Sequence, residues 1–262
     1  MGRRRGRGAR QRIITPCPAS HFAPPGPPQW RRASSTGHNS APKAVHSPAA
    51  GSIPMFSLQT MFGQGNQFYS LLEDAAAAAN DAARALHAML READRQPALD
   101  AFKLARLRER EASDKISQAL VDSFITPIER EDIEALGSAL YKIPKQIEKF
   151  ADRYSLATQH LEHIDFAPRA AMLEQASEVV VQMVKALRAM KLEPMKVLND
   201  RLRALENEAD RLMLELYRDI YSGKLDAREM FLLKEFFEIL EKAIDRCREA
   251  GVVAYEIVLK NS

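Results

Sequence analysis

Cysteine is scarce in this sequence: Cys17 and Cys247 are the only two among 262 residues. Two cysteines cannot form the disulfide framework that holds small secreted domains together, so a fold built on disulfides is excluded. Only Cys247 lies in the part of the chain that we expect to fold, which favours a reducing compartment. These points predict a cytoplasmic protein.

Long apolar runs are also missing. The longest, around Val179–Val181, falls far short of the ~20 residues that a transmembrane helix needs. We therefore expect any membrane association to be peripheral and to depend on a protein partner. Walker A, GxGxxG, GxSxG and CxxC motifs are absent too, so these common signatures of enzyme chemistry do not apply.

Acidic residues are absent from residues 1–54, which hold nine basic ones. The remainder, residues 55–262, has 29 basic and 35 acidic residues and a net charge of −6. The whole-chain charge of +3 and the basic pI of about 8.8 therefore arise from the first 54 residues. A basic pI would otherwise suggest nucleic acid, but here the expected folded part is acidic, so no nucleic-acid partner is expected.

Residues 1–54 are rich in Arg, Pro, Gly and Ser and show no apolar periodicity. Such a segment cannot bury enough apolar surface to offset its conformational entropy, so disorder is predicted. A nucleic-acid-binding arm and a transit peptide are two interpretations. A third, which we favour, is an upstream extension from a misassigned start codon, with Met55 as the true start. The folded domain is then residues 55–262.

Helical signals dominate from Asn66 onward, with much Ala, Leu, Glu, Lys and Arg and apolar residues three or four apart. Proline and glycine separate the segments, as at Pro97, Pro127 and Gly223. Six helices are predicted, at 66–94, 98–124, 130–161, 167–191, 195–221 and 227–260. Long helices with short connections indicate an all-α, up-down bundle.

The apolar positions suggest a duplication into two three-helix repeats. A shift of 96 residues aligns Ile116, Leu120 and Phe124 with Leu212, Leu216 and Ile220, and a shift of 100 aligns the third predicted helix with the sixth. Periodic helices also align by chance, so spacing alone leaves the repeat open.

Two acidic pairs stand out in the second half: Glu206 with Asp210, and Glu241 with Asp245. Each pair is spaced i, i+4, so both carboxylates lie on one helical face, one residue beyond an apolar position. Two packed helices would bring these pairs together. A cation would relieve the repulsion, and oxygen ligands suit iron, manganese, magnesium or calcium. The alternative is two acidic pairs on a solvated helix surface.

Several motifs resemble the PhoU-like family associated with Pit-type phosphate transporters. Residues 124–133 resemble its FITP-acid-REDI signature, Leu205–Leu212 its LENEADRL segment, and Leu240–Arg248 its LE-x-A-x-DRC segment. Residues 256–261 resemble its C-terminal tail. The motifs occur in the family's order across residues 55–262.

This resemblance implies a PhoU-like bundle of six long helices built from two three-helix repeats. It implies that Glu206, Asp210, Glu241 and Asp245 are metal ligands, with iron, in a cluster or otherwise, as the first candidate and other divalent cations open. It also implies a non-catalytic regulator or accessory protein of inorganic phosphate transport. Its partner would be a Pit-type phosphate permease or a phosphate signalling protein, and oligomers are possible.

The first repeat departs from this pattern. The positions that match the four ligands are Arg110, Asp114, Tyr141 and Lys145, so three of four carboxylates are missing. No metal cluster is expected there. Two interpretations of the basic stripe formed by Lys142, Lys145 and Lys149 remain: an anion-receptive patch, or a solvated face paired with Glu148 and Asp152.

Two other functions compete with that of a regulator. One is a metal-free helical scaffold. The other is a ferritin-like di-metal carboxylate enzyme, which needs Glu-x-x-His on its helices. The residues three before His87, His160 and His163 are not glutamates, so this motif is absent.

Overall fold

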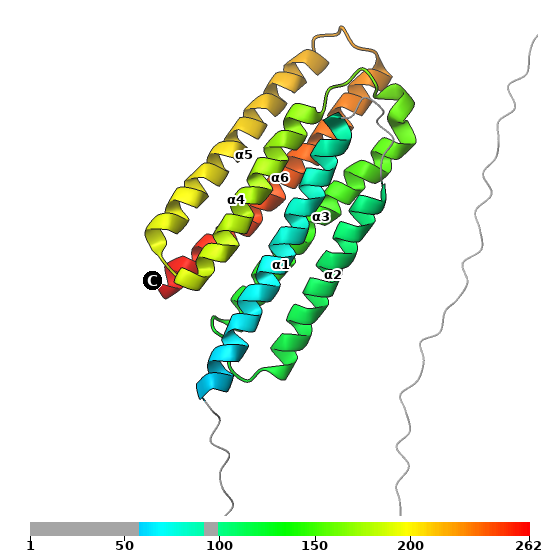
Figure 1. Ribbon diagram of the computed structural model, residues 1–262. Helices are drawn as coiled ribbons and strands as arrows, with labels where there is room; N and C mark the ends of the chain where they lie inside the picture. Colours follow the sequence, from blue (N-terminus) through cyan, green and yellow to red (C-terminus); the bar gives the residue numbers. More distant parts are fainter. Residues whose placement is uncertain (1–57, 92–98) are drawn as a thin grey trace, which may run out of the picture. The chain divides into compact units, whose positions relative to one another are not determined.

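The computed structural model describes residues 58–91 and 99–262, and within these it contains six α-helices and no strand (Figure 1). The predicted all-α class is confirmed. The prediction of disorder for residues 1–54 lies outside the described residues. The helices are α1 (Leu58–Arg91), α2 (Leu99–Asp122), α3 (Arg130–Ala157), α4 (Ala167–Ala186), α5 (Leu192–Ile220) and α6 (Ala227–Asn261).

Helix ends differ from the predicted ones at several places. Both α3 and α4 end earlier than predicted and continue into short 3₁₀ turns, Thr158–His160 and Leu187–Ala189. The second turn ends at Met190, whose φ of 47° is left-handed and stops the helix. In the other direction, α1 begins at Leu58 and not at residue 66, because glycine costs a helix only about 1 kcal/mol per residue and does not forbid it.

One predicted apolar position is wrong. Phe124, aligned with the buried Ile220, lies beyond the end of α2 and is fully exposed. The chain leaves the helix at Asp122, so the helical spacing no longer decides which way Phe124 points. The preceding aligned residues, Ile116 and Leu120, are buried and half-buried as expected.

The bundle consists of two three-helix repeats, α1–α3 and α4–α6. Each helix packs against the other two of its repeat, and the repeats meet through α1 with α4 and α3 with α6. The first helices of the two repeats thus contact each other, and so do the third helices. The middle helices, α2 and α5, lie on opposite flanks of the bundle (Figure 1). No helix in the described part of the chain is long and apolar enough to cross a membrane.

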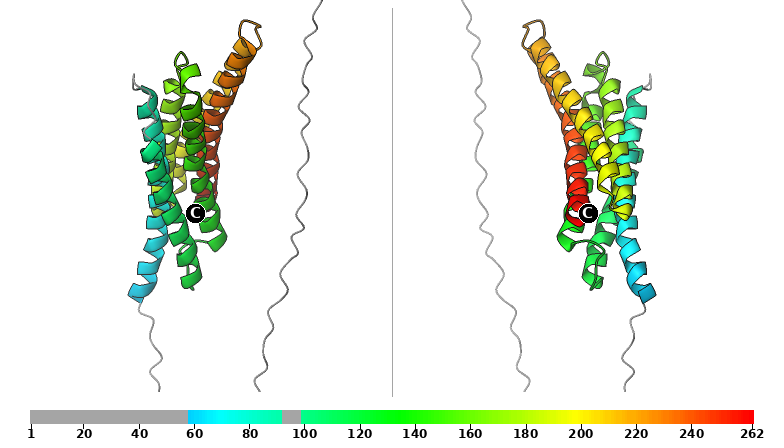
Figure 2. Two further views of the ribbon diagram at one scale, coloured as in Figure 1. Left: turned by 90° about the vertical axis from the view of Figure 1, so that its right-hand side faces the viewer. Right: turned by 90° about the vertical axis from the view of Figure 1, so that its left-hand side faces the viewer.

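The α5–α6 hairpin is joined by a short turn that projects away from the other helices (Figure 2). Gly223 supplies a positive φ of 77° in this turn. Asp226 then caps α6, accepting hydrogen bonds from the backbone N–H groups of Arg228 and Glu229, and the Glu229 side chain accepts one from the Asp226 N–H. These signals fix where α6 begins and so set its register against α5.

Close packing holds the hairpin onto α4. Gly251 of α6 lies so near its neighbours that an added Cβ would be 2.3 Å from Leu202 Cδ2 and 3.2 Å from Met183 Sδ. Leu202 and Met183 are themselves fully buried. The missing side chain at this position lets α4, α5 and α6 approach one another.

Candidate metal centre

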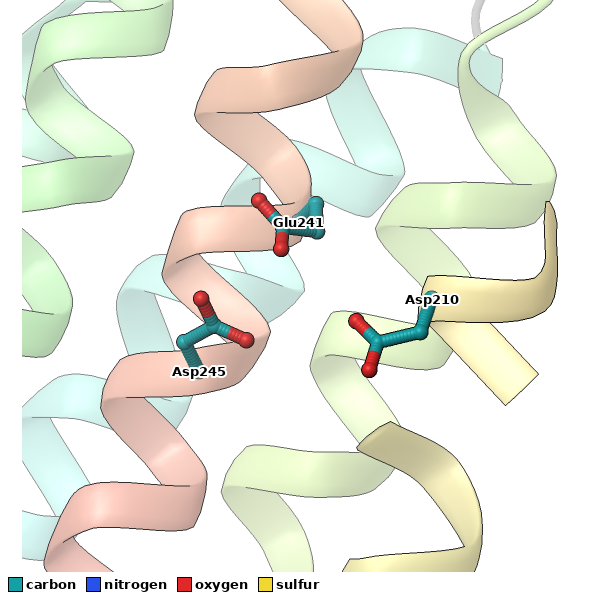
Figure 3. Close-up of side chains that lie close together, drawn as sticks. All are labelled: Asp210, Glu241 and Asp245. Carbon is teal, nitrogen blue, oxygen red and sulfur yellow. The ribbon is translucent and has the colours of Figure 1, made fainter. Parts of the chain in front are cut away.

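Three of the four predicted ligands meet between α5 and α6. One carboxylate oxygen each from Asp210, Glu241 and Asp245 lies within 4.8 Å of the others. Asp210 of α5 points toward the two acidic residues of α6 (Figure 3). The register explains this, because Asp210 is 15 residues before Leu225 in the connecting turn and Glu241 is 16 after it. Antiparallel helices place such equidistant residues side by side.

Burial and the crowding of like charges raise the pKa values of Glu241 and Asp245. Burial first, then the neighbouring Asp245 and Asp210, raises the pKa of Glu241 to about 7. The pKa of Asp245 is raised as well, mainly by burial and then by Asp210 and Glu206. Glu241 and Asp245 therefore hold protons more tightly than ordinary carboxylates do, and a bound cation would displace these protons.

No member of this cluster has an ion-pair partner among the described residues. Four other carboxylates of the hairpin do have one: Glu208 and Glu215 pair with Arg211, Glu238 with Lys234, and Glu249 with Lys142 and Arg246. The three acidic residues that converge thus lack an ion pair of their own, although the charge of Arg246 offsets part of the rise in the pKa of Asp245.

The fourth predicted ligand, Glu206, is not part of this group. Its Oε2 lies 3.1 Å from Nε of Arg248, a side chain that is 13% exposed. Arg248 also donates from Nη1 to Oδ1 of the buried Asn199 at 2.8 Å. Glu206 is still near enough to raise the pKa of Asp245, so it lies next to the cluster with its charge directed to Arg248.

On the other side of the cluster, Tyr217 Oη donates to Glu238 Oε1 at 2.5 Å. That bond, followed by burial, raises the pKa of Tyr217 to about 12. Cys247, two residues after Asp245, is buried in the core and does not join the cluster. The donor set is thus all carboxylate, without histidine or thiolate, and it suits a hard or borderline cation.

The corresponding place in the first repeat holds a protein cation. Arg106 of α2, only 4% exposed, pairs with Glu109 at 2.8 Å and with Glu148 at 3.0 Å. Its guanidinium lies 4.7 Å from the ring centroid of Tyr141 and donates to its hydroxyl at 3.2 Å. Tyr141 is the residue that matches Glu241, so a guanidinium stands where the second repeat gathers carboxylates.

The structure contains no second acidic cluster of this kind in its described part. Arg110 and Asp114, the α2 residues that match Glu206 and Asp210, are exposed. Sequence reasoning identified the departure of the first repeat but missed Arg106. It also missed Arg248, although its spacing of three after Asp245 and seven after Glu241 places it on the same face of α6.

No protein-family model matches the chain. Two solved structures from Shewanella oneidensis MR-1 share its fold: one described as a PhoU-like phosphate regulatory protein, the other as a PhoU-like protein. Their TM-scores are 0.62 and 0.64 at 17% and 16% sequence identity. The alignments cover 74% and 73% of this chain and 99% of each solved chain. The chain has the PhoU-like fold, as its motifs predict.

Among individual proteins, the chain is similar to UPF0111 protein YkaA of Bacillus subtilis (strain 168). The two are 25% identical over 142 residues, which make up 53% of this chain and 68% of YkaA.

Proposed function

We propose that this protein is a regulator or accessory protein of inorganic phosphate transport that binds a divalent metal ion in its second repeat. It acts through contact with another protein and not by catalysis. Asp210, Glu241 and Asp245 are the ligands that the geometry favours, with Glu206 as a further ligand once it leaves Arg248.

The observation that carries the metal site is the contrast between paired and unpaired carboxylates on one hairpin. Exposed carboxylates repel little, but Glu241 and Asp245 are half-buried, and their pKa values are raised. Keeping these two groups together, with the exposed Asp210 within 4.8 Å of both, costs free energy that a bound cation would recover. Iron is the first candidate, and manganese and magnesium fit the same oxygen donors.

The link to phosphate is supported by the comparisons, since one of the Shewanella proteins with this fold is described as phosphate regulatory. We propose that the partner is a Pit-type phosphate permease or a phosphate signalling protein. Contact with such a permease would place this protein at the cytoplasmic side of the membrane, as a peripheral component.

Deletion of the gene tests the role in transport. Phosphate uptake and accumulation are measured in the deletion strain, and after complementation with the wild-type gene or with the Asp210→Asn/Asp245→Asn variant. We expect deletion to alter uptake, wild type to restore it, and the variant to fail although it is present at a normal level. Unchanged uptake in both phosphate-rich and phosphate-poor medium would refute the role.

The two rival functions are separated by simpler measurements. Purified protein that takes up no iron, manganese or magnesium would indicate a metal-free scaffold. Rapid oxygen consumption on addition of ferrous iron would indicate a ferritin-like enzyme. The absence of histidine from the acidic cluster in the described residues argues against the latter.

A further inference from the structure

A second polar site lies between the two repeats. A cleft of about 530 Å³ runs between α3 and α6, within the size range of ordinary ligand pockets. Five of the side chains that line it are cationic: Lys142, Lys145, Lys149, Arg153 and Arg246. Four of them come from α3 and lie on one face of that helix, while Arg246 comes from α6.

Most of the carboxylates near the cleft are already engaged. Glu249 serves two cations at once, with Lys142 Nζ at 2.5 Å and Arg246 Nη1 at 2.6 Å. Glu148, which the solvated-face interpretation assigned to the lysines, pairs with the buried Arg106 instead. Glu235 pairs with Arg153. The expected neutralisation of the lysine stripe by Glu148 is therefore wrong.

Two lysines remain without an ion-pair partner in the described part of the chain. Lys145 and Lys149 are exposed, one helical turn apart, and neither has a carboxylate within 4.0 Å. Lys145 Nζ lies 5.7 Å from the Tyr141 ring centroid. Against the five cations stand Asp152, Glu235 and Glu249, together with Glu148, which shares Arg106 with Glu109, so the cleft keeps a net positive charge.

The shape of this excess charge favours an extended anion. The cations run along α3 from Lys142 to Arg153, roughly 16 Å at 1.5 Å per residue. A single phosphate would meet only one end of this stripe. No aromatic ring lines the cleft, so it offers no surface for stacking a nucleobase. Lysine ammonium groups bind phosphate oxygens as point charges and do not require one fixed geometry.

From this arrangement we infer that the α3–α6 cleft is a binding site for a multiply charged phosphate chain, an inorganic oligophosphate, with Lys145 and Lys149 as its main contacts. The site differs from the acidic cluster, because its two main contacts lie on α3 whereas the cluster lies between α5 and α6. Arg246 lines the cleft and also acts on Asp245 of the cluster, so binding is tested on the metal-free protein.

The test is isothermal titration calorimetry of the full-length, EDTA-treated and dialysed protein with tripolyphosphate at low ionic strength. We expect saturable binding of one tripolyphosphate per chain, weaker binding of inorganic phosphate, and an affinity for ATP no higher than that for tripolyphosphate. The Lys145→Gln/Lys149→Gln variant should bind tripolyphosphate about tenfold more weakly, because two charge-assisted contacts are lost.

A matched control removes two exposed lysines elsewhere, Lys196→Gln/Lys224→Gln, with the same change in net charge. It should keep its affinity within about twofold, since distant exposed charges are screened by salt. Absence of saturable binding, or equal loss in the control and the cleft variant, would overturn the inference. Much tighter binding of ATP, or of polyglutamate, would show that the cleft recognises something other than a phosphate chain.

Discussion

The guanidinium of Arg248 lies 3.1 Å from the Glu206 carboxylate and holds this side chain out of the acidic cluster. The arginine thus acts as an internal counter-ion for Glu206, beside three carboxylates that form no ion pair with any described residue. A metal ion bound by four carboxylates would have to compete with Arg248 for the fourth.

The first prediction removes this competitor. Arg248→Gln frees Glu206 to act as a fourth carboxylate donor, so we expect the affinity for ferrous iron or manganese to rise, by about tenfold if the freed carboxylate adds about 1.4 kcal/mol of binding free energy. The metal-free variant should melt at a lower temperature, because a fourth carboxylate then faces the other three. Arg211→Gln is the control, since Arg211 pairs only with the exposed Glu208 and Glu215 on the same hairpin. Lower metal affinity in the Arg248 variant would contradict this account.

The second prediction concerns the cluster itself. Asp210→Asn/Asp245→Asn removes two anionic oxygen donors at nearly constant volume, so most of the bound metal should be lost. Helical content should stay the same, and the metal-free protein should be at least as stable as wild type, because the repulsion is relieved. Metal content is measured by elemental analysis after loading and desalting.

Asp114→Asn provides the matched control in the first repeat, where the acidic side chain is exposed and has no partners in a cluster. It should leave metal content unchanged. Equal metal in wild type and in the double variant would eliminate the proposed site, and metal loss in the Asp114 variant would move it to the first repeat.

The third prediction follows from the pKa of Glu241, which burial and the neighbouring carboxylates raise from 4.5 to about 7. Between these two values the folded, metal-free protein keeps a proton that the unfolded chain has lost. Stability must therefore fall as pH rises through this window. We expect the melting temperature in EDTA to decline from about pH 5 to about pH 8, and to decline less in Glu241→Gln.

Glu208→Gln is the control for this pH effect. A hydrogen bond from Arg211 lowers the pKa of Glu208, so this group titrates below the window and should not alter the slope. Identical slopes for wild type and Glu241→Gln would show that Glu241 is ionised in the folded protein throughout.

The fourth prediction compares two helical glycines. Gly251→Ala places a Cβ 2.3 Å from Leu202 Cδ2, so it should destabilise the fold by about 1–3 kcal/mol. Gly137→Ala meets nothing closer than Ile116 Cδ1 at 3.5 Å, and should stabilise by up to about 1 kcal/mol through helix propensity. Urea unfolding measures both. Equal effects would mean that α6 can shift away from α5.

Much of this architecture was predictable from sequence, because apolar spacing and helix-breaking residues report local physics. The hairpin turn at Gly223 and the i, i+4 pairs were enough to predict that Asp210, Glu241 and Asp245 meet. The pairing of Glu206 with Arg248 was not predictable. Glu206 could either join the acidic cluster or pair with Arg248, because the cluster and the arginine lie on the same face of α6. Which of these Glu206 does depends on Asn199 of α5, because Asn199 accepts a hydrogen bond from Arg248 and orients its side chain.

Arg106 shows another limit. It stands in a strongly charged helix where Leu104 and Leu107 are 49% and 54% exposed, so the sequence gives little indication of which face is buried. Its burial depends on partners 3 and 42 residues away, Glu109 and Glu148, and on the Tyr141 ring. Such a network is a property of the packed helices and is not visible in the spacing of any one of them.

The buried guanidinium of Arg106 also makes the stability of the two repeats depend differently on metal ions. The first repeat carries its own cation in the polypeptide, so its resistance to opening does not depend on a metal ion at the corresponding place. Under the proposed metal binding, the second repeat gains stability in proportion to the logarithm of free metal concentration above the dissociation constant. Hydrogen exchange in α5 and α6 would then slow as the free metal concentration in the cell rises. Exchange in α2 and α3 would not respond to metal, so its rate would serve as an internal reference within the same chain.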